Sequence, residues 1–233
     1  MTENITRKAC NRCGTCCIKG GPALHHKDRE LLQNNMLRLE HLITIRKGEP
    51  VFSLAAETPE PAQSEIIKIK GRGTEWTCFF FQENSTKCDI YEHRPLECSL
   101  LKCWETADLE KIAGRHLLSR YDIIEPHDPI LPFIKAHDDK CSLENLTPVL
   151  SEVNSKDSQQ EALHILTRLV NTDLALRSQA CMRFHFSLDL ELFFLGRPFF
   201  KILNQFGINM HEENGVCSLS LASSSSSEMQ VNP

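Results

Sequence analysis

The sequence lacks the features that would direct a protein to a membrane or to nucleic acid. Its longest apolar runs, such as Leu192 to Leu195, are too short to cross a lipid bilayer. The net charge is -5 and the pI is about 6.1, so the composition shows no excess of positive charge for nucleic acid or an anionic membrane. Residues 1–9 are polar and charged and lack the apolar stretch of a secretory signal peptide. We therefore expect a cytoplasmic protein with no nucleic-acid partner and no membrane partner.

The common catalytic motifs are also absent from the sequence. No serine–histidine–acid order and no pair of carboxylates stands out as a hydrolytic site. Gly71-Arg-Gly73 lacks the third glycine and the following helix of a nucleotide-binding loop, so we interpret it as a turn. Catalytic residues and residues for an organic cofactor are therefore not assigned, and whether the protein is an enzyme stays open.

Cysteine is the residue that the chain has in excess. There are 11 cysteines, an odd number, and the reducing cytosol disfavours structural disulfides. Eight of them lie between Cys10 and Cys103. We expect the other three, Cys141, Cys181 and Cys217, to be small core residues, since none has a close cysteine partner in the sequence. The eight clustered thiols indicate metal binding.

The first group of thiols is Cys10, Cys13, Cys16 and Cys17, within eight residues of a polar segment that offers no core. Three cysteines at three-residue intervals are typical of [4Fe–4S] ferredoxins, whereas zinc ribbons combine two distant pairs. Gly14 eases the tight loop that convergence of these side chains requires. We expect the adjacent side chains of Cys16 and Cys17 to diverge, which argues against their binding one small ion together.

The second group is Cys78, Cys88, Cys98 and Cys103, with Arg94-Pro95 breaking the chain before the third of them. The eight thiols suffice for two four-cysteine centres or for one centre with spare thiols, and both arrangements stay open. Arg94 either offsets the charge of the thiolates or pairs with Glu92 or Glu97.

The combined motifs resemble those of the YkgJ-type CxxCxxCC family, described as zinc- or iron-chelating cysteine cluster proteins. The resemblance covers residues 8–104 and rests on Cys10-x2-Cys13-Gly14-x-Cys16-Cys17, Cys78-Phe-Phe and Cys88-Asp-Ile-Tyr-Glu-His-Arg-Pro-x2-Cys98-x4-Cys103. Segments around Gly20-Gly21-Pro22 and Gly196-Arg197-Pro198 are similar to those of the longer bacterial members. The resemblance implies metal ligation by all eight of these cysteines, through an iron–sulfur cluster or Zn²⁺.

We predict an α+β fold with three parts. Residues 8–104 form an irregular, metal-centred module with a small β-hairpin, residues 105–210 form a helical region packed on it, and residues 217–233 form a disordered tail. Expected elements are a helix at 26–33, a strand at 42–46, a hairpin of 66–70 with 76–81, and helices at 108–121, from 158 onward and at 188–195. Pro126, Pro129 and Pro132 are expected to form a stiff connection.

Three functions are compatible with this pattern. The first is a metal-binding protein with a redox, electron-transfer or metal-handling role. The second is a protein-modifying enzyme, because a similar cysteine-rich region occurs in flagellin lysine N-methylases. The third is an interaction module that zinc folds and that meets an unknown protein partner through Phe193, Phe194, Phe199 and Phe200.

Overall fold

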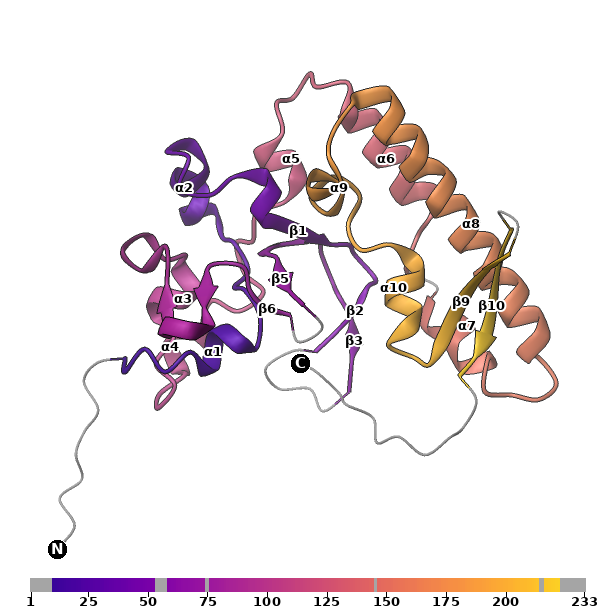
Figure 1. Cartoon of the computed structure of the whole chain (residues 1–233), viewed down its shortest axis with the longest axis horizontal. Helices are drawn as coiled ribbons and strands as arrows, with labels where there is room; N and C mark the ends of the chain where they lie inside the picture. The colour runs from indigo at the N-terminus through magenta and orange to yellow at the C-terminus, as the bar shows by residue number, and fades with distance from the viewer. Residues whose placement is uncertain (1–9, 53–57, 74–75, 145, 214–215, 223–233) are drawn as a thin grey trace, which may run out of the picture.

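The computed structural model describes residues 10–52, 58–73, 76–144, 146–213 and 216–222 and has an α+β fold (Figure 1). Short strand pairs and short helices make up the cysteine-rich N-terminal part. The C-terminal half contains the 26-residue helix α8 (Gln159–Phe184). These features confirm the predicted fold class. Within the described ranges, no helix is both long and apolar enough to span a bilayer.

A buried strand pair joins the two halves of the chain. β1 (Leu42–Ile45) is buried along its whole length and pairs antiparallel with β4 (Ile66–Ile69). Helix α9 (Leu188–Leu195), rich in leucine and phenylalanine, lies against β1. Because β1 of the N-terminal half packs against α9 of the C-terminal half, the two halves share one hydrophobic core.

The predicted hairpin of 66–70 with 76–81 is wrong in its pairing. β4 pairs with β1, while β5 (Gly71–Arg72) pairs with β6 (Thr77–Cys78). In this way Ile67 and Ile69 of β4 are buried beside β1, a strand that is buried along its whole length. Of the predicted hairpin, the structure forms only the short β5–β6 pair. Residues 74 and 75, between these two strands, lie outside the described residues.

The rest of the N-terminal part consists of short helices and two-residue strands. They are α1 (Thr15–Ile18), η1 (His26–Asp28), α2 (Arg29–Gln33), η2 (Leu39–His41), β2 (Pro50–Val51), β3 (Glu60–Pro61), β7 (Phe81–Gln82), η3 (Glu83–Ser85), β8 (Lys87–Cys88), η4 (Tyr91–His93) and α3 (Leu96–Leu100). The expected helix at 26–33 is present as η1 followed by α2.

The helix expected at 108–121 is wrong. The chain forms only α4 (Ala107–Glu110) and α5 (Arg120–Ile123). Between them, Gly114 and His116 have positive φ angles of 69° and 53°, which a right-handed helix cannot contain. Leu109 and Leu118 are instead buried in two separate turns of the chain.

The C-terminal half is mainly helical, with a strand pair at its end. Helix α6 (Ile130–Lys140) begins after Pro129 and contains Pro132 in its first turn, where no backbone N–H is required, so the expected proline connection is shorter than predicted. It is followed by α7 (Leu146–Glu152), α8, α9 and α10 (Phe199–Asn204).

The expected disordered tail at 217–233 is wrong in its first part. β9 (Ile208–Glu213) pairs antiparallel with β10 (Val216–Leu221), and β10 lies on α8. Alternating side chains of β10, among them Cys217 and Leu219, are at least half-buried, which explains why this polar-looking stretch is ordered. Residues 223–233 lie outside the described residues.

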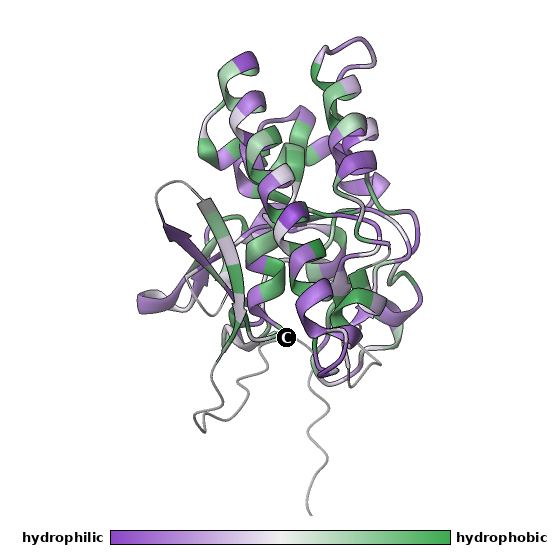
Figure 2. Cartoon of the chain, turned by 90° about the vertical axis from the view of Figure 1, so that its right-hand side faces the viewer, coloured by the Kyte–Doolittle hydropathy of each residue, from purple (hydrophilic) through white to green (hydrophobic). Residues whose placement is uncertain are grey.

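Two hydrophobic clusters underlie this arrangement. One lies around Leu42, Ile67, Phe81 and Phe193, beneath the cysteine-rich part, and the other lies among α7, α8, α10 and β9. Figure 2 shows the helices striped in hydrophobic and hydrophilic colours, as expected of elements with one buried face.

Candidate metal centre

Two turns of similar geometry present Cys78 and Cys88. Each cysteine ends a two-residue strand, β6 or β8, and each strand is followed by a tight turn. The backbone N–H of Phe80 donates to the sulfur of Cys78, and that of Ile90 donates to the sulfur of Cys88. Hydrogen bonds from N–H groups stabilise the thiolate form of a cysteine, which is the form that binds metal. Both turns therefore favour metal ligation.

A glycine with a positive φ angle places the N-terminal thiols. Gly14 has a φ of 81° and begins α1, which carries Cys16 and Cys17 and lies against β6. A β-carbon on Gly14 would collide with the ring of Phe81, which is buried at the start of β7. The loop of the first cysteine group is thus packed directly on the turn region of the second group.

Helix α3, which carries Cys98, is anchored by two carboxylates. Asp28 accepts a hydrogen bond from the backbone N–H of Leu96 at 2.8 Å. Glu97 accepts one from the N–H of Ala23 at 2.8 Å and contacts Nε2 of the buried His25 at 3.2 Å. His25 therefore holds Glu97, the neighbour of Cys98.

Five of the eight predicted ligands lie close enough to alter one another's ionisation, and we call them the five interacting thiols: Cys16, Cys17, Cys78, Cys88 and Cys98. Burial raises the pKa of Cys78, Cys88 and Cys98, and negative charge on neighbouring thiols raises it further. Several half-buried thiols that resist ionising together require a cation to become thiolates. The set has the electrostatics of a metal centre.

Cys16 and Cys17 do not diverge as the sequence led us to expect. Their sulfur atoms are 4.0 Å apart. Hydrogen bonding from the Cys17 thiol lowers the pKa of Cys16 to about 6, while the same bond raises the pKa of Cys17. The one-turn helix α1, which follows Gly14, brings both side chains to the same side. Both thiols can therefore contribute to one centre.

Arg94 lies beside the thiols. Its positive charge adds to the lowering of the Cys16 pKa that Cys17 causes, and it opposes the rise in the Cys88 pKa that burial causes. Its guanidinium stacks on the ring of Tyr91 at 3.7 Å from the ring centre, and Arg12 stacks on the same ring at 3.9 Å. The ion pair with Glu97 that the sequence left open is not formed, since Glu97 is bound by His25 and Ala23. This arrangement favours the charge-offsetting role of Arg94.

The other three predicted ligands are exposed. The sulfur of Cys10 accepts a hydrogen bond from the N–H of Arg12 at 3.3 Å, and that of Cys13 lies 3.3 Å from the hydroxyl of Thr15. Cys103 is exposed in a tight turn after α3. Their ligation of the same centre stays a prediction.

The thiols do not form a compact tetrahedral cage. Among the residues that the structure describes, no three of the eight sulfur atoms lie within 4.8 Å of one another. Four thiolates on one zinc ion lie about 3.8 Å apart, as Zn–S bonds of about 2.3 Å require. A larger centre, in which each thiolate binds a different iron atom, accepts a wider spacing.

Comparison with known proteins now identifies the cysteine-rich part. Residues 9–115 match the CxxCxxCC family. The description of this CxxCxxCC family is "Putative zinc- or iron-chelating domain". The match confirms the resemblance inferred from the cysteine spacing, and all eight of the clustered cysteines lie within it. No curated protein and no solved structure matches the chain.

Sequence reasoning missed a buried polar network in the C-terminal half. It comprises His137, Cys141 and Asp173 and the charged residues around them. Cys141 was expected to be a core residue, and it is buried, but its sulfur lies beside an imidazole and a carboxylate. The only sequence signal was the four-residue spacing of His137 and Cys141, which puts two side chains on one face of a helix.

Proposed function

We propose that the protein binds an iron–sulfur cluster through the thiols of its CxxCxxCC region and serves in electron transfer, redox sensing or metal handling. The family description supports zinc or iron chelation. The observation that carries the choice of a cluster is the wide spacing of the thiols: five interact electrostatically, yet no three in the described ranges are within 4.8 Å of one another. Three cysteines at three-residue intervals add to this preference.

The residues present fit such a group chemically. Cys16, Cys17, Cys78, Cys88 and Cys98 supply thiolates from four separate elements, and Cys10, Cys13 and Cys103 offer three further exposed thiols. Backbone N–H groups donate to sulfur, and Arg94 adds positive charge without forming an ion pair with Glu97. Hydrogen bonds to sulfur and nearby charge set the reduction potential of an iron–sulfur centre. A cluster held here would exchange electrons near the molecular surface, because Cys16 is exposed.

Cysteine-to-serine variants test the proposal. We expect Cys78→Ser and Cys98→Ser to lose most of the iron and acid-labile sulfide that the anaerobically purified protein contains. Cys181→Ser is the matched control, since Cys181 is a half-buried free cysteine on α8, far along the chain from the CxxCxxCC region. Unchanged iron and sulfide content in Cys78→Ser and Cys98→Ser would refute the assignment.

A zinc-structured interaction module is the second candidate. The N–H-to-sulfur turns at Cys78 and Cys88 favour it, because they suit thiolates on a single ion as well. A colourless protein with stoichiometric zinc, and with the same dependence on Cys78 and Cys98, would establish this alternative. A methyl-transfer activity rests on the resemblance alone, and calorimetry with S-adenosylmethionine on the metal-loaded protein tests it.

A further inference from the structure

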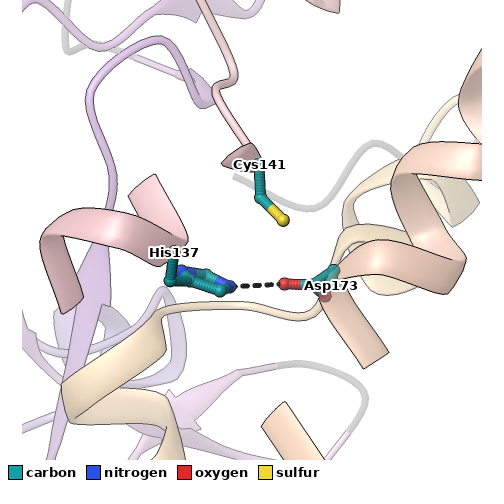
Figure 3. Close-up of side chains that lie close together, drawn as sticks. All are labelled: His137, Cys141 and Asp173. Atoms are coloured by element: carbon teal, nitrogen blue, oxygen red, sulfur yellow. Dashed lines mark hydrogen bonds and ion pairs between the residues drawn. The ribbon is translucent and has the colours of Figure 1, made fainter. Parts of the chain in front are cut away.

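We propose a second, independent metal site in the C-terminal half, in which His137 Nε2, Cys141 Sγ and Asp173 Oδ1 bind one Zn²⁺ ion. These three donor atoms all lie within 4.8 Å of one another, and all three side chains are fully buried. Figure 3 shows the sulfur of Cys141 directed toward the His137–Asp173 pair. One nitrogen, one sulfur and one oxygen donor form a ligand set that zinc accepts, with the fourth position left open.

Local structure explains why these side chains meet. His137 and Cys141 are one turn apart at the C-terminal end of α6, so both side chains lie on the face that packs against α8. Asp173 lies near the middle of α8 and points across to them. Burying a carboxylate, an imidazole and a thiol at a helix–helix contact has a cost that hydrophobic residues would avoid, which calls for a reason beyond packing.

The groups behind the three donors are placed as the supporting groups of a metal site are. Asp173 Oδ2 accepts hydrogen bonds from Arg177 Nε at 2.9 Å and from the N–H of Phe199 at 3.0 Å, which leaves Oδ1 directed at His137. His137 Nδ1 lies 3.7 Å from Asp138 Oδ1. In the described chain these two buried atoms have no hydrogen-bond partner. A carboxylate behind the second nitrogen of a metal-binding histidine orients the ring and fixes its tautomer.

Binding requires only small movements and a defined transfer of protons. His137 Nε2 and Asp173 Oδ1 are 2.7 Å apart and share a proton, whereas donors on a tetrahedral zinc ion lie about 3.3–3.7 Å apart. Zinc takes the place of that proton, His137 carries its proton on Nδ1 facing Asp138, and Cys141 releases its thiol proton to solvent. Burial raises the pKa of Cys141 to about 11, so the metal-free thiol is neutral and unsuited to act as a nucleophile.

The experiment is ¹¹³Cd NMR of the full chain, with ¹¹³Cd²⁺ as the probe for zinc and with ¹⁵N-labelled histidine. We expect a resonance shielded relative to any sulfur-rich centre and coupled to one imidazole nitrogen. The resonance should be absent from Cys141→Ser and present in Cys217→Ser, the control that alters another buried cysteine of the C-terminal half. It should also persist in Cys78→Ser, which separates this site from the proposed cluster.

Each outcome decides the proposal. A histidine-coupled mixed-donor resonance that Cys141→Ser removes supports the site. Its absence from the wild-type protein, or its persistence in Cys141→Ser, overturns it and leaves His137 as a buried residue hydrogen-bonded to Asp173. Should Cys141→Ser fail to fold, the wild-type coupling to an imidazole assigned to His137 decides the question without a variant.

Discussion

Replacing Gly14 by alanine should destabilise the protein through two separable effects. Gly14 has a φ of 81°, and placing an L-residue in the left-handed region costs about 1–2 kcal/mol. The new methyl group would also collide with the Phe81 ring, which is only 3% exposed and cannot swing into solvent. Overpacking of this kind costs about 1–3 kcal/mol. We expect Gly14→Ala to lower the free energy of unfolding by roughly 2–5 kcal/mol.

The matched control is Gly114→Ala. Gly114 has a similar φ of 69°, but nothing lies within 4 Å of the position that its β-carbon would occupy. Gly114→Ala should therefore lose only the conformational part, about 1–2 kcal/mol. The assay is urea unfolding followed by circular dichroism on anaerobically purified protein, with metal content measured in parallel. Equal losses in the two variants would refute the packing of the first cysteine loop on Phe81.

Three further predictions follow from the ionisable groups. In metal-free protein, the reaction of Cys16 with iodoacetamide should have a midpoint near pH 6, because hydrogen bonding from Cys17 lowers the pKa of Cys16 below the usual range for a thiol. Peptide mass mapping over pH 5–9 measures this midpoint, and a value above 8 would contradict the prediction. Arg94→Gln should move that midpoint upward, because the positive charge that lowers the pKa of Cys16 is lost, while Arg38→Gln should leave it unchanged. Arg120→Met should lower the free energy of unfolding by about 3–5 kcal/mol in urea titrations, because Arg120 is buried between Glu65 and Asp138 and its loss leaves carboxylates unpaired. Arg29→Gln, which breaks the exposed pair with Asp122, should cost less than about 1 kcal/mol, and similar losses in the two arginine variants would contradict the burial argument.

The elements that the sequence predicted well are those set by local chemistry. The long helix after Ser158 and the helix at 188–195 ending at Gly196 follow from apolar periodicity and a helix-ending glycine. The strand at 42–46 follows from a run of branched residues. Ser158, which precedes this long helix, donates to the side chain of Glu152, a contact that apolar periodicity does not reveal.

The failures involve partners far apart in the chain. The choice of β1 as the partner of β4 depends on α9, about 120 residues later, which covers that pair, and no local pattern contains this information. The helix expected at 108–121 is interrupted because His116 accepts a bond from the backbone N–H of His26 through its carbonyl, again a distant contact. The strand β10 depends on packing against α8.

The cysteine spacing predicted the match of residues 9–115 to the CxxCxxCC family, and the structure adds how the thiols are grouped. The cysteine spacing could not predict that the sulfur atoms of Cys16 and Cys17 approach each other, because their approach depends on the one-turn helix α1 that follows Gly14. It also could not find the network around His137, whose members lie on α5, α6 and α8 and become neighbours only in the folded core. Ligation by all eight clustered cysteines stays a prediction.

The most direct test of the central claim is Mössbauer spectroscopy of protein produced with ⁵⁷Fe and purified without oxygen, combined with iron, zinc and sulfide analysis. The account predicts iron and sulfide in equal amounts, a visible charge-transfer absorbance and the quadrupole doublets of thiolate-ligated iron in a cluster. Protein that contains neither iron nor zinc, yet unfolds at the same urea concentration before and after treatment with a chelator, would contradict it.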